Sequence, residues 1–153
     1  MEEPRWLDER EARVWQSYLA VNRELHSALE RQLVRDAGLS NADYALLAPL
    51  SEAPDGVVRS RELGTLVGWE RSRLSHQIGR MEKRGLVTRE DCAEDARGSM
   101  VRLTPAGRAA IESAAPAHVE TVRRYVFDAM STEEVEVLTR VFHRVLARIA
   151  TDG

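Results

Sequence analysis

The side chains best suited to chemistry in this 153-residue sequence are arginines gathered between positions 59 and 89. All but one of the 22 basic residues are arginine, and Lys83 is the exception. Segment 59–89 holds eight basic and three acidic residues, a net charge of +5, whereas the whole chain carries −3 and the remainder therefore −8. Guanidinium groups form planar, two-pronged contacts with phosphates and guanines. The segment could therefore contact nucleic acid, or it could equally be the solvated face of a helix.

Other chemistry has little support in the sequence. There is no glycine-rich phosphate loop, nucleophile elbow or local set of metal ligands, so we expect neither an enzyme nor a metal or cofactor. The single cysteine, Cys92, excludes an internal disulfide, and its acidic neighbours disfavour a reactive thiolate. The sequence has no apolar run long enough for a membrane span and no recognisable signal peptide, which favours a cytoplasmic protein. With 43% apolar residues, a chain of this length can form the core of one domain.

Long helices are expected on both sides of the basic segment. Apolar residues three or four apart predict one helix over 7–38, about 45 Å long, which exceeds what a compact domain of this size needs. Two further helices are predicted after Thr104-Pro105, an N-cap followed by proline, and after Ser131, which opens a capping box. These helices carry apolar stripes that one small subunit cannot bury. They therefore indicate a dimer.

Segment 40–104 is expected to contain helices, turns and a hairpin. Ser40, with Asp43 three residues on as a variant of the capping box, is predicted to begin a helix. Ser60 is predicted to cap a short helix, and a further helix follows over 69–84. Runs of strand character at 86–89 and 100–103 predict a hairpin with a long loop. The helix over 69–84 has a single buried stripe, formed by Leu74, Ile78 and Met81, and its other faces are expected to carry polar residues, Gln77 among them.

A helix pair followed by a hairpin is typical of winged helix-turn-helix proteins, in which the second helix enters the major groove. The outward face of helix 69–84 carries the candidate recognition residues Arg71, Ser72, Arg73, Ser75, His76 and Arg80. Ser60 and Arg61 are candidates for contacts with the DNA backbone. Arg97, the basic residue of the hairpin loop, is the candidate for the minor groove. For each of these residues, the alternative is that it is exposed to solvent and contacts no DNA.

The sequence resembles the MarR (multiple antibiotic resistance regulator) family of winged-helix transcription factors. The resemblance rests on Leu63 to Gly68, on MEKRGLVTR (81–89), on DARG (95–98) and on VRLTPAG (101–107). Met81 stands where the family usually has leucine. The helices before and after these motifs also fit, so the likeness covers essentially the whole chain.

This resemblance implies a mainly α fold with a small β wing, comprising about six helices and a β-hairpin in a single MarR-like chain. Segments 7–38 and 105–150 would be dimerisation helices, and 40–104 would be the winged helix-turn-helix region. It further implies a homodimer that binds a pseudo-palindromic operator in double-stranded DNA, more often as a repressor than as an activator.

The family also suggests roles for the wing and for a ligand. In the family's wing, the acidic residue corresponding to Asp95 orients the wing and Arg97 enters the minor groove. An unidentified small-molecule effector is possible, and Trp15, Tyr18 and Tyr44 could line its cleft, although core or dimer packing is the more ordinary role of such aromatics. The alternative function is a winged helix that binds another protein, and the basic outward face of helix 69–84 counts against it.

Overall fold

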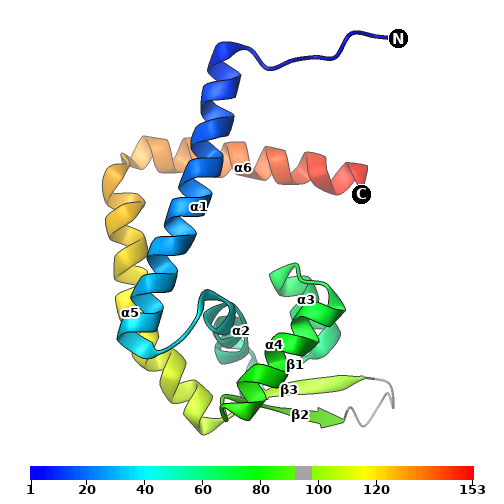
Figure 1. Cartoon of the computed structure of the whole chain (residues 1–153), viewed down its shortest axis with the longest axis vertical. Helices are drawn as coiled ribbons and strands as arrows, with labels where there is room; N and C mark the ends of the chain where they lie inside the picture. The colour runs from blue at the N-terminus through cyan, green and yellow to red at the C-terminus, as the bar shows by residue number, and fades with distance from the viewer. Residues whose placement is uncertain (92–97) are drawn as a thin grey trace.

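The computed structural model describes residues 1–91 and 98–153, and its first element is a long helix (Figure 1). Helix α1 spans Glu9–Ala37. Its start is set by Asp8, whose carboxylate accepts the amides of Arg10 and Glu11, and its end by Gly38, which has the left-handed φ of 64°. Its 29 residues extend about 43 Å. The long helix predicted over 7–38 is confirmed.

The winged part follows α1 and contains a three-stranded sheet. Helix α2 (Asn41–Glu52) and the 3₁₀ turn η1 (Pro54–Gly56) lead into strand β1 (Val57–Arg59). The further elements of this part are α3 (Ser60–Val67), α4 (Arg71–Lys83), β2 (Val87–Asp91) and β3 (Ser99–Leu103). The strands are antiparallel in the order β1-β3-β2. The expected hairpin is therefore confirmed, and β1 extends it to a sheet.

Two helices complete the chain. Helix α5 (Pro105–Tyr125) begins at the N-cap Thr104, whose hydroxyl accepts the amide of Gly107 at 2.9 Å. The 3₁₀ turn η2 (Phe127–Ala129) separates it from α6 (Thr132–Asp152). Ser131 and Glu134 form the capping box that the sequence predicts for this last helix. No helix among the described residues is long and apolar enough to cross a membrane.

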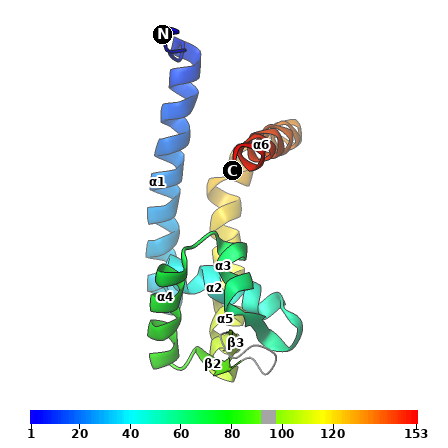
Figure 2. The same cartoon turned by 90° about the vertical axis from the view of Figure 1, so that its right-hand side faces the viewer.

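The hydrophobic core lies within the winged part and the adjoining halves of α1 and α5. Its buried members come from α1, α2, α3, α4, the sheet and α5: Leu33, Leu46, Leu47, Leu50, Leu63, Ile78, Met81, Val101 and Ile111. Helix α6, in contrast, has no buried residue and extends sideways from the far end of α5 (Figures 1 and 2). The core therefore lies in the winged part, and among the described residues α6 and the first half of α1 have no buried side chain.

Candidate nucleic-acid interface

Helix α4 divides into a buried and an exposed side, as the sequence predicts. Leu74, Ile78 and Met81 are at most 4% exposed. All six candidate recognition residues are exposed: Arg71, Ser72, Arg73, Ser75, His76 and Arg80. The prediction that Gln77 belongs to the polar outward side is wrong, because its side chain is buried and bonded to Asp43 of α2. The helix therefore presents a continuous polar face while its apolar stripe anchors it.

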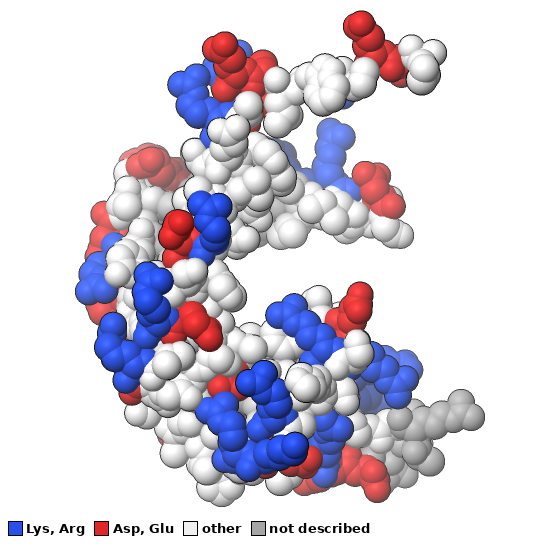
Figure 3. Space-filling model, in the orientation of Figure 1, with Lys and Arg blue, Asp and Glu red and all other residues white. Residues whose placement is uncertain are grey.

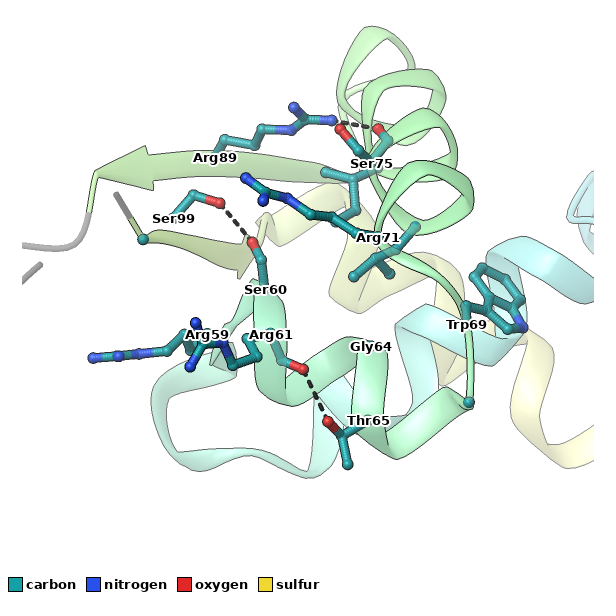
Figure 4. Close-up of a pocket in the computed structure, with 14 residues that line it drawn as sticks. Arg59, Ser60, Arg61, Gly64, Thr65, Trp69, Arg71, Ser75, Arg89 and Ser99 are labelled. Carbon is teal, nitrogen blue, oxygen red and sulfur yellow. Dashed lines mark hydrogen bonds between the residues drawn. The ribbon is translucent and has the colours of Figure 1, made fainter. Parts of the chain in front are cut away.

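A groove of about 1320 Å³ runs between α4, α3 and the sheet. Arg59, Arg61, Arg71 and Arg89 line it together with the apolar Leu74 and Ile78. Figure 4 shows the side chains of Arg59, Arg61 and Arg71 reaching from β1, α3 and α4 toward the same open side. Among the described residues, Arg61, Arg71 and Arg80 form no ion pair, so their charges are available to a polyanion.

The side chains of two candidate residues, Arg73 and Ser60, contact other side chains of the protein. The guanidinium carbon of Arg73 lies 4.1 Å from the centre of the Trp69 ring, a cation–π contact that orients this side chain. Ser60 was expected to cap α3, but Arg59 is the N-cap residue and no side chain caps the helix. The Ser60 hydroxyl instead lies 2.6 Å from the hydroxyl of Ser99, because β3 passes beside the start of α3. Ser60 therefore joins α3 to the sheet.

Arg89 attaches the wing to α4. Its guanidinium donates to the carbonyl of Ser75 at 2.5 Å, and its backbone amide donates to the Glu82 carboxylate at 3.0 Å. Within the sheet, Arg102 makes two bonds with Glu90, at 2.5 and 3.2 Å. These bonds lower the pKa of Glu90. These bonds thus join β2 to both α4 and β3.

Asp43 connects α2 to α4 in a way that the sequence did not reveal. Its side chain is 3% exposed and bonds Arg84 at 2.6 Å and Gln77 at 2.7 Å. Burial alone would raise the pKa of Asp43, but the bonds from Arg84 and Ser40 outweigh it and hold the pKa below its ordinary value. The capping box identified Asp43 as the partner of Ser40, whereas pairing with residues 34 and 41 positions away leaves no local signal.

The remaining predicted positions are not brought together. Asp95 and Arg97 lie outside the described residues, as does Cys92. Trp15 and Tyr18 stack on each other at 5.6 Å on the exposed half of α1, and Trp15 lies about 33 Å along the helix from Ala37. Tyr44 packs instead against His118 of α5, with ring centres 4.1 Å apart. Within one protomer the length of α1 therefore separates Trp15 and Tyr18 from Tyr44, and a role of any of them in an effector cleft stays a prediction.

The Tyr44–His118 contact marks the joint between α2 and α5. Burial lowers the pKa of His118 and raises that of Tyr44. Nδ1 of His118 is buried without a hydrogen-bond partner among the described residues. The described residues contain no group of three or more His, Cys, Asp or Glu side chains that could hold a metal ion.

The charges of the molecule are unevenly distributed. In Figure 3, Lys and Arg side chains gather over the winged part in the lower half of the view. This is the part that contains the +5 segment 59–89. The apolar residues exposed on α1 and α6 lie in the other half of the molecule. Two surfaces of different chemistry therefore occupy opposite ends of the chain's fold.

Comparisons with known proteins find members of one family. A sequence model of the MarR family matches residues 37–98. Sco3205, a MarR family transcriptional regulator from Streptomyces coelicolor solved in complex with DNA, is 42% identical with a TM-score of 0.91, covering 95% of this chain and 91% of that one. AbsC, a MarR family transcriptional regulator from the same organism, is 37% identical with a TM-score of 0.92, covering 97% and 99%. The M. tuberculosis regulator MosR, also solved with DNA, is 28% identical with a TM-score of 0.72, covering 89% and 96%.

Proposed function

The chain belongs to the MarR family of transcriptional regulators, and on this premise we propose that it is a sequence-specific DNA-binding regulator that acts as a homodimer. The observation that carries the proposal is the arginine-lined groove beside α4. Arg61 and Arg71 reach its open side from two different elements and have no acidic partner among the described residues. Unpaired guanidinium groups on one rigid surface can neutralise successive phosphates and release their counterions.

The parts of this surface have different roles in the proposal. The exposed side of α4 reads base edges in the major groove through its candidate residues, chiefly Arg71, Ser75, His76 and Arg80. Arg61, at the start of α3, binds the DNA backbone. The Ser60 hydroxyl is occupied by Ser99, so Ser60 contributes mainly by holding α3 against the sheet. By likeness to the family, Asp95 and Arg97 supply the wing's contact with the minor groove.

Dimerisation follows from the apolar residues that the protomer leaves exposed. On α6 they are Val137, Phe142, Val145, Leu146 and Ile149, and on α1 they include Val14, Trp15, Tyr18 and Val21. A 21-residue helix with no buried residue needs a partner to bury its apolar stripe. A second copy related by a two-fold axis supplies one, and the same axis makes the DNA site pseudo-palindromic.

Repression and release by a small molecule complete the proposal. A dimer that covers an operator blocks other proteins from the same DNA. An effector weakens this binding only through its preference for a dimer whose winged parts do not fit the two half-sites. The α2–α5 joint at Tyr44 and His118 lies between the two functional ends of the molecule, so ligand binding there would change their relative position.

Selection of duplexes from a random DNA pool, followed by anisotropy titration at several salt concentrations, tests the function. We expect a pseudo-palindromic sequence to bind at least about a thousandfold more tightly than random duplex, with affinity falling steeply as salt rises. Equal affinity for selected and random DNA, or binding that does not respond to salt, would contradict the proposal.

A further inference from the structure

Four groups connect α4 to the corner between α1 and α2, and we call them the corner clamp: the side chains of Asp43, Gln77 and Arg84 and the carbonyl of Gly38. We propose that the corner clamp sets the orientation of α4 relative to α1, and thereby the distance between the two recognition helices in the dimer. This inference rests on the proposed function. It assigns positioning roles to residues that do not themselves face DNA.

The clamp holds α4 at two points on one side. Oδ1 of Asp43 accepts Nε2 of Gln77 at 2.7 Å, and Oδ2 accepts Nη1 of Arg84 at 2.6 Å. The two donors are seven residues apart and so lie on the same side of the helix, about 10 Å from each other along its axis. Two anchors on one side resist rotation of α4 about its axis as well as sliding. The apolar stripe cannot do this alone, because hydrophobic contact has no direction.

Hydrogen bonds also join this part of the molecule to α1. Nη2 of Arg84 donates to the carbonyl of Gly38, which ends α1, at 2.9 Å. At the start of α2, the amide of Asn41 donates to the Glu30 carboxylate at 2.5 Å, and its side chain donates to the His26 carbonyl at 2.8 Å. The end of α1, the start of α2 and the far half of α4 are thus joined by short bonds, several of them to charged groups.

No comparable side-chain link joins α4 to α3. Among the described residues, the two helices share no side-chain hydrogen bond, and apolar packing of Leu63 and Leu74 fills the space between them. Arg89 does bond α4, but it belongs to the sheet and moves with the winged part. The corner clamp is therefore the polar connection by which the position of α1, the dimerisation helix, affects the orientation of α4, the recognition helix.

In a dimer, this connection determines which operators fit. Each α4 must enter the major groove of its own half-site, so the separation of the two helices selects the separation of the half-sites. With the clamp intact, a duplex with one base pair added or removed between the half-sites should bind poorly. Without it, α4 can tilt relative to α1, together with the sheet to which Arg89 joins it, and meet the displaced half-site. The dimer should then discriminate less between spacings.

The test compares half-site spacings in four full-length proteins: the wild type, Arg84→Met, Arg84→Lys and Arg35→Met. The probes are the duplex selected by the wild type and two derivatives with one base pair inserted or removed at the centre. The readout is the ratio of the dissociation constants for altered and selected spacing. We expect Arg84→Met to reduce this ratio roughly fivefold or more, and Arg84→Lys to reduce it less because lysine keeps the charge without the two-pronged geometry.

Arg35→Met is the matched control. Arg35 bonds the neighbouring Asp36 at 2.9 Å on the surface of α1 and has no hydrogen bond or ion pair to another element among the described residues, so its variant should keep the wild-type ratio. If Arg84→Met lowers every affinity by the same factor, its role is only structural and the inference is overturned while the function stands. If Arg84→Met does not fold, Gln77→Met, which removes the other anchor, undergoes the same test. Failure of the wild type to select any duplex would overturn both proposals.

Discussion

Gly107 shows how a single missing side chain allows two elements to meet. A Cβ at this position would lie 2.0 Å from the carbonyl oxygen of Leu86 and 2.8 Å from Cδ1 of Leu103. The same carbonyl accepts the amide of Thr104 at 3.1 Å. The first turn of α5 therefore lies directly on the turn between α4 and β2, and any larger residue would push them apart.

We expect Gly107→Ala to lower the free energy of unfolding by about 3 kcal/mol, because a backbone carbonyl cannot move aside as a flexible side chain can. Urea denaturation monitored by circular dichroism measures this. Gly79→Ala in α4 is the control, since its new Cβ would meet only the end of Arg89 at 3.5 Å. It should be neutral or stabilise by up to about 1 kcal/mol. Equal losses in the two variants would contradict the assigned contact.

Asp43 gives a prediction in which pH has a defined sign. Its folded-state pKa is held below the ordinary value, against the opposing effect of burial, by bonds from Arg84 and Ser40. The ionised carboxylate therefore stabilises the fold above the unfolded-state pKa of about 3.9. This contribution is lost as the pH falls through the lower folded-state pKa.

Asp43→Asn should lower the free energy of unfolding by about 2 kcal/mol at pH 7, since an amide replaces a charged acceptor of a buried bond. The difference from the wild type should stay constant from about pH 7 to 5 and shrink below about pH 4. Denaturation curves across this range provide the measurement. Asp36→Asn, on the exposed surface of α1, should change far less. A difference that is independent of pH would show that the charge of Asp43 is irrelevant.

At the scale of elements, signals confined to a few neighbouring residues predicted the helices well. Ser40, Thr104 and Ser131 each bond an amide three residues ahead, so sequence spacing alone reveals them. Ser60 fits the same pattern, yet its hydroxyl bonds Ser99, 39 residues away. The capping rule fails there because a tertiary partner competes for the side chain.

In the candidate site too, the sequence predicts features that depend on neighbouring residues and misses features that depend on distant partners. The 3.6-residue period placed Arg71 and Arg80 on the exposed side of α4, because burial of the apolar stripe determines the opposite face. It also placed Gln77 there, although the buried Asp43 draws this amide inward. A polar residue beside an apolar stripe can face either way, and only the position of α2 decides. Helix length likewise separates Trp15 from Tyr44, which composition cannot show.

The start of α3 offers a prediction for one element. Arg61 lines the groove and has no ion pair among the described residues. Arg61→Ala should weaken binding to all duplexes by a similar factor and reduce the slope of log affinity against log salt by about 1, as expected for one lost phosphate contact. Arg13→Ala, which removes the same charge from the far end of α1, should leave the slope unchanged. A change in base preference without a change in slope would instead place Arg61 on a base.

For the whole molecule, the net charge of −3 conceals two unlike parts. Segment 59–89 carries +5 and the rest −8, and the positive part is the one that contains α4 and the groove. An acidic remainder repels a duplex that approaches in any other orientation. We therefore expect binding to random DNA to be weak, and specific contacts to account for most of the affinity. Titration of random duplex at low and high salt tests this, and tight binding at physiological salt would contradict it.

A substitution on helix α6 tests whether the protein forms a dimer through the apolar stripe of this helix. Ile149 is 64% exposed and Leu146 is 61% exposed in the protomer, on a helix that has no buried residue. Ile149→Asp should convert the dimer to a monomer in sedimentation at micromolar concentration, because a charge cannot be buried in an apolar contact between two copies. Ala147→Asp, which introduces the same charge on the opposite side of α6, should remain dimeric.

The same pair of variants separates assembly from DNA reading. The winged part has its own core, so the Ile149→Asp monomer should keep its helical circular dichroism while losing affinity for a two-half-site operator far more than for a single half-site. The melting temperature of the wild type should rise with protein concentration, and that of the monomer should not. A dimeric Ile149→Asp variant with unchanged operator affinity would place the interface elsewhere. The apolar stripe of α6 would then need a different partner.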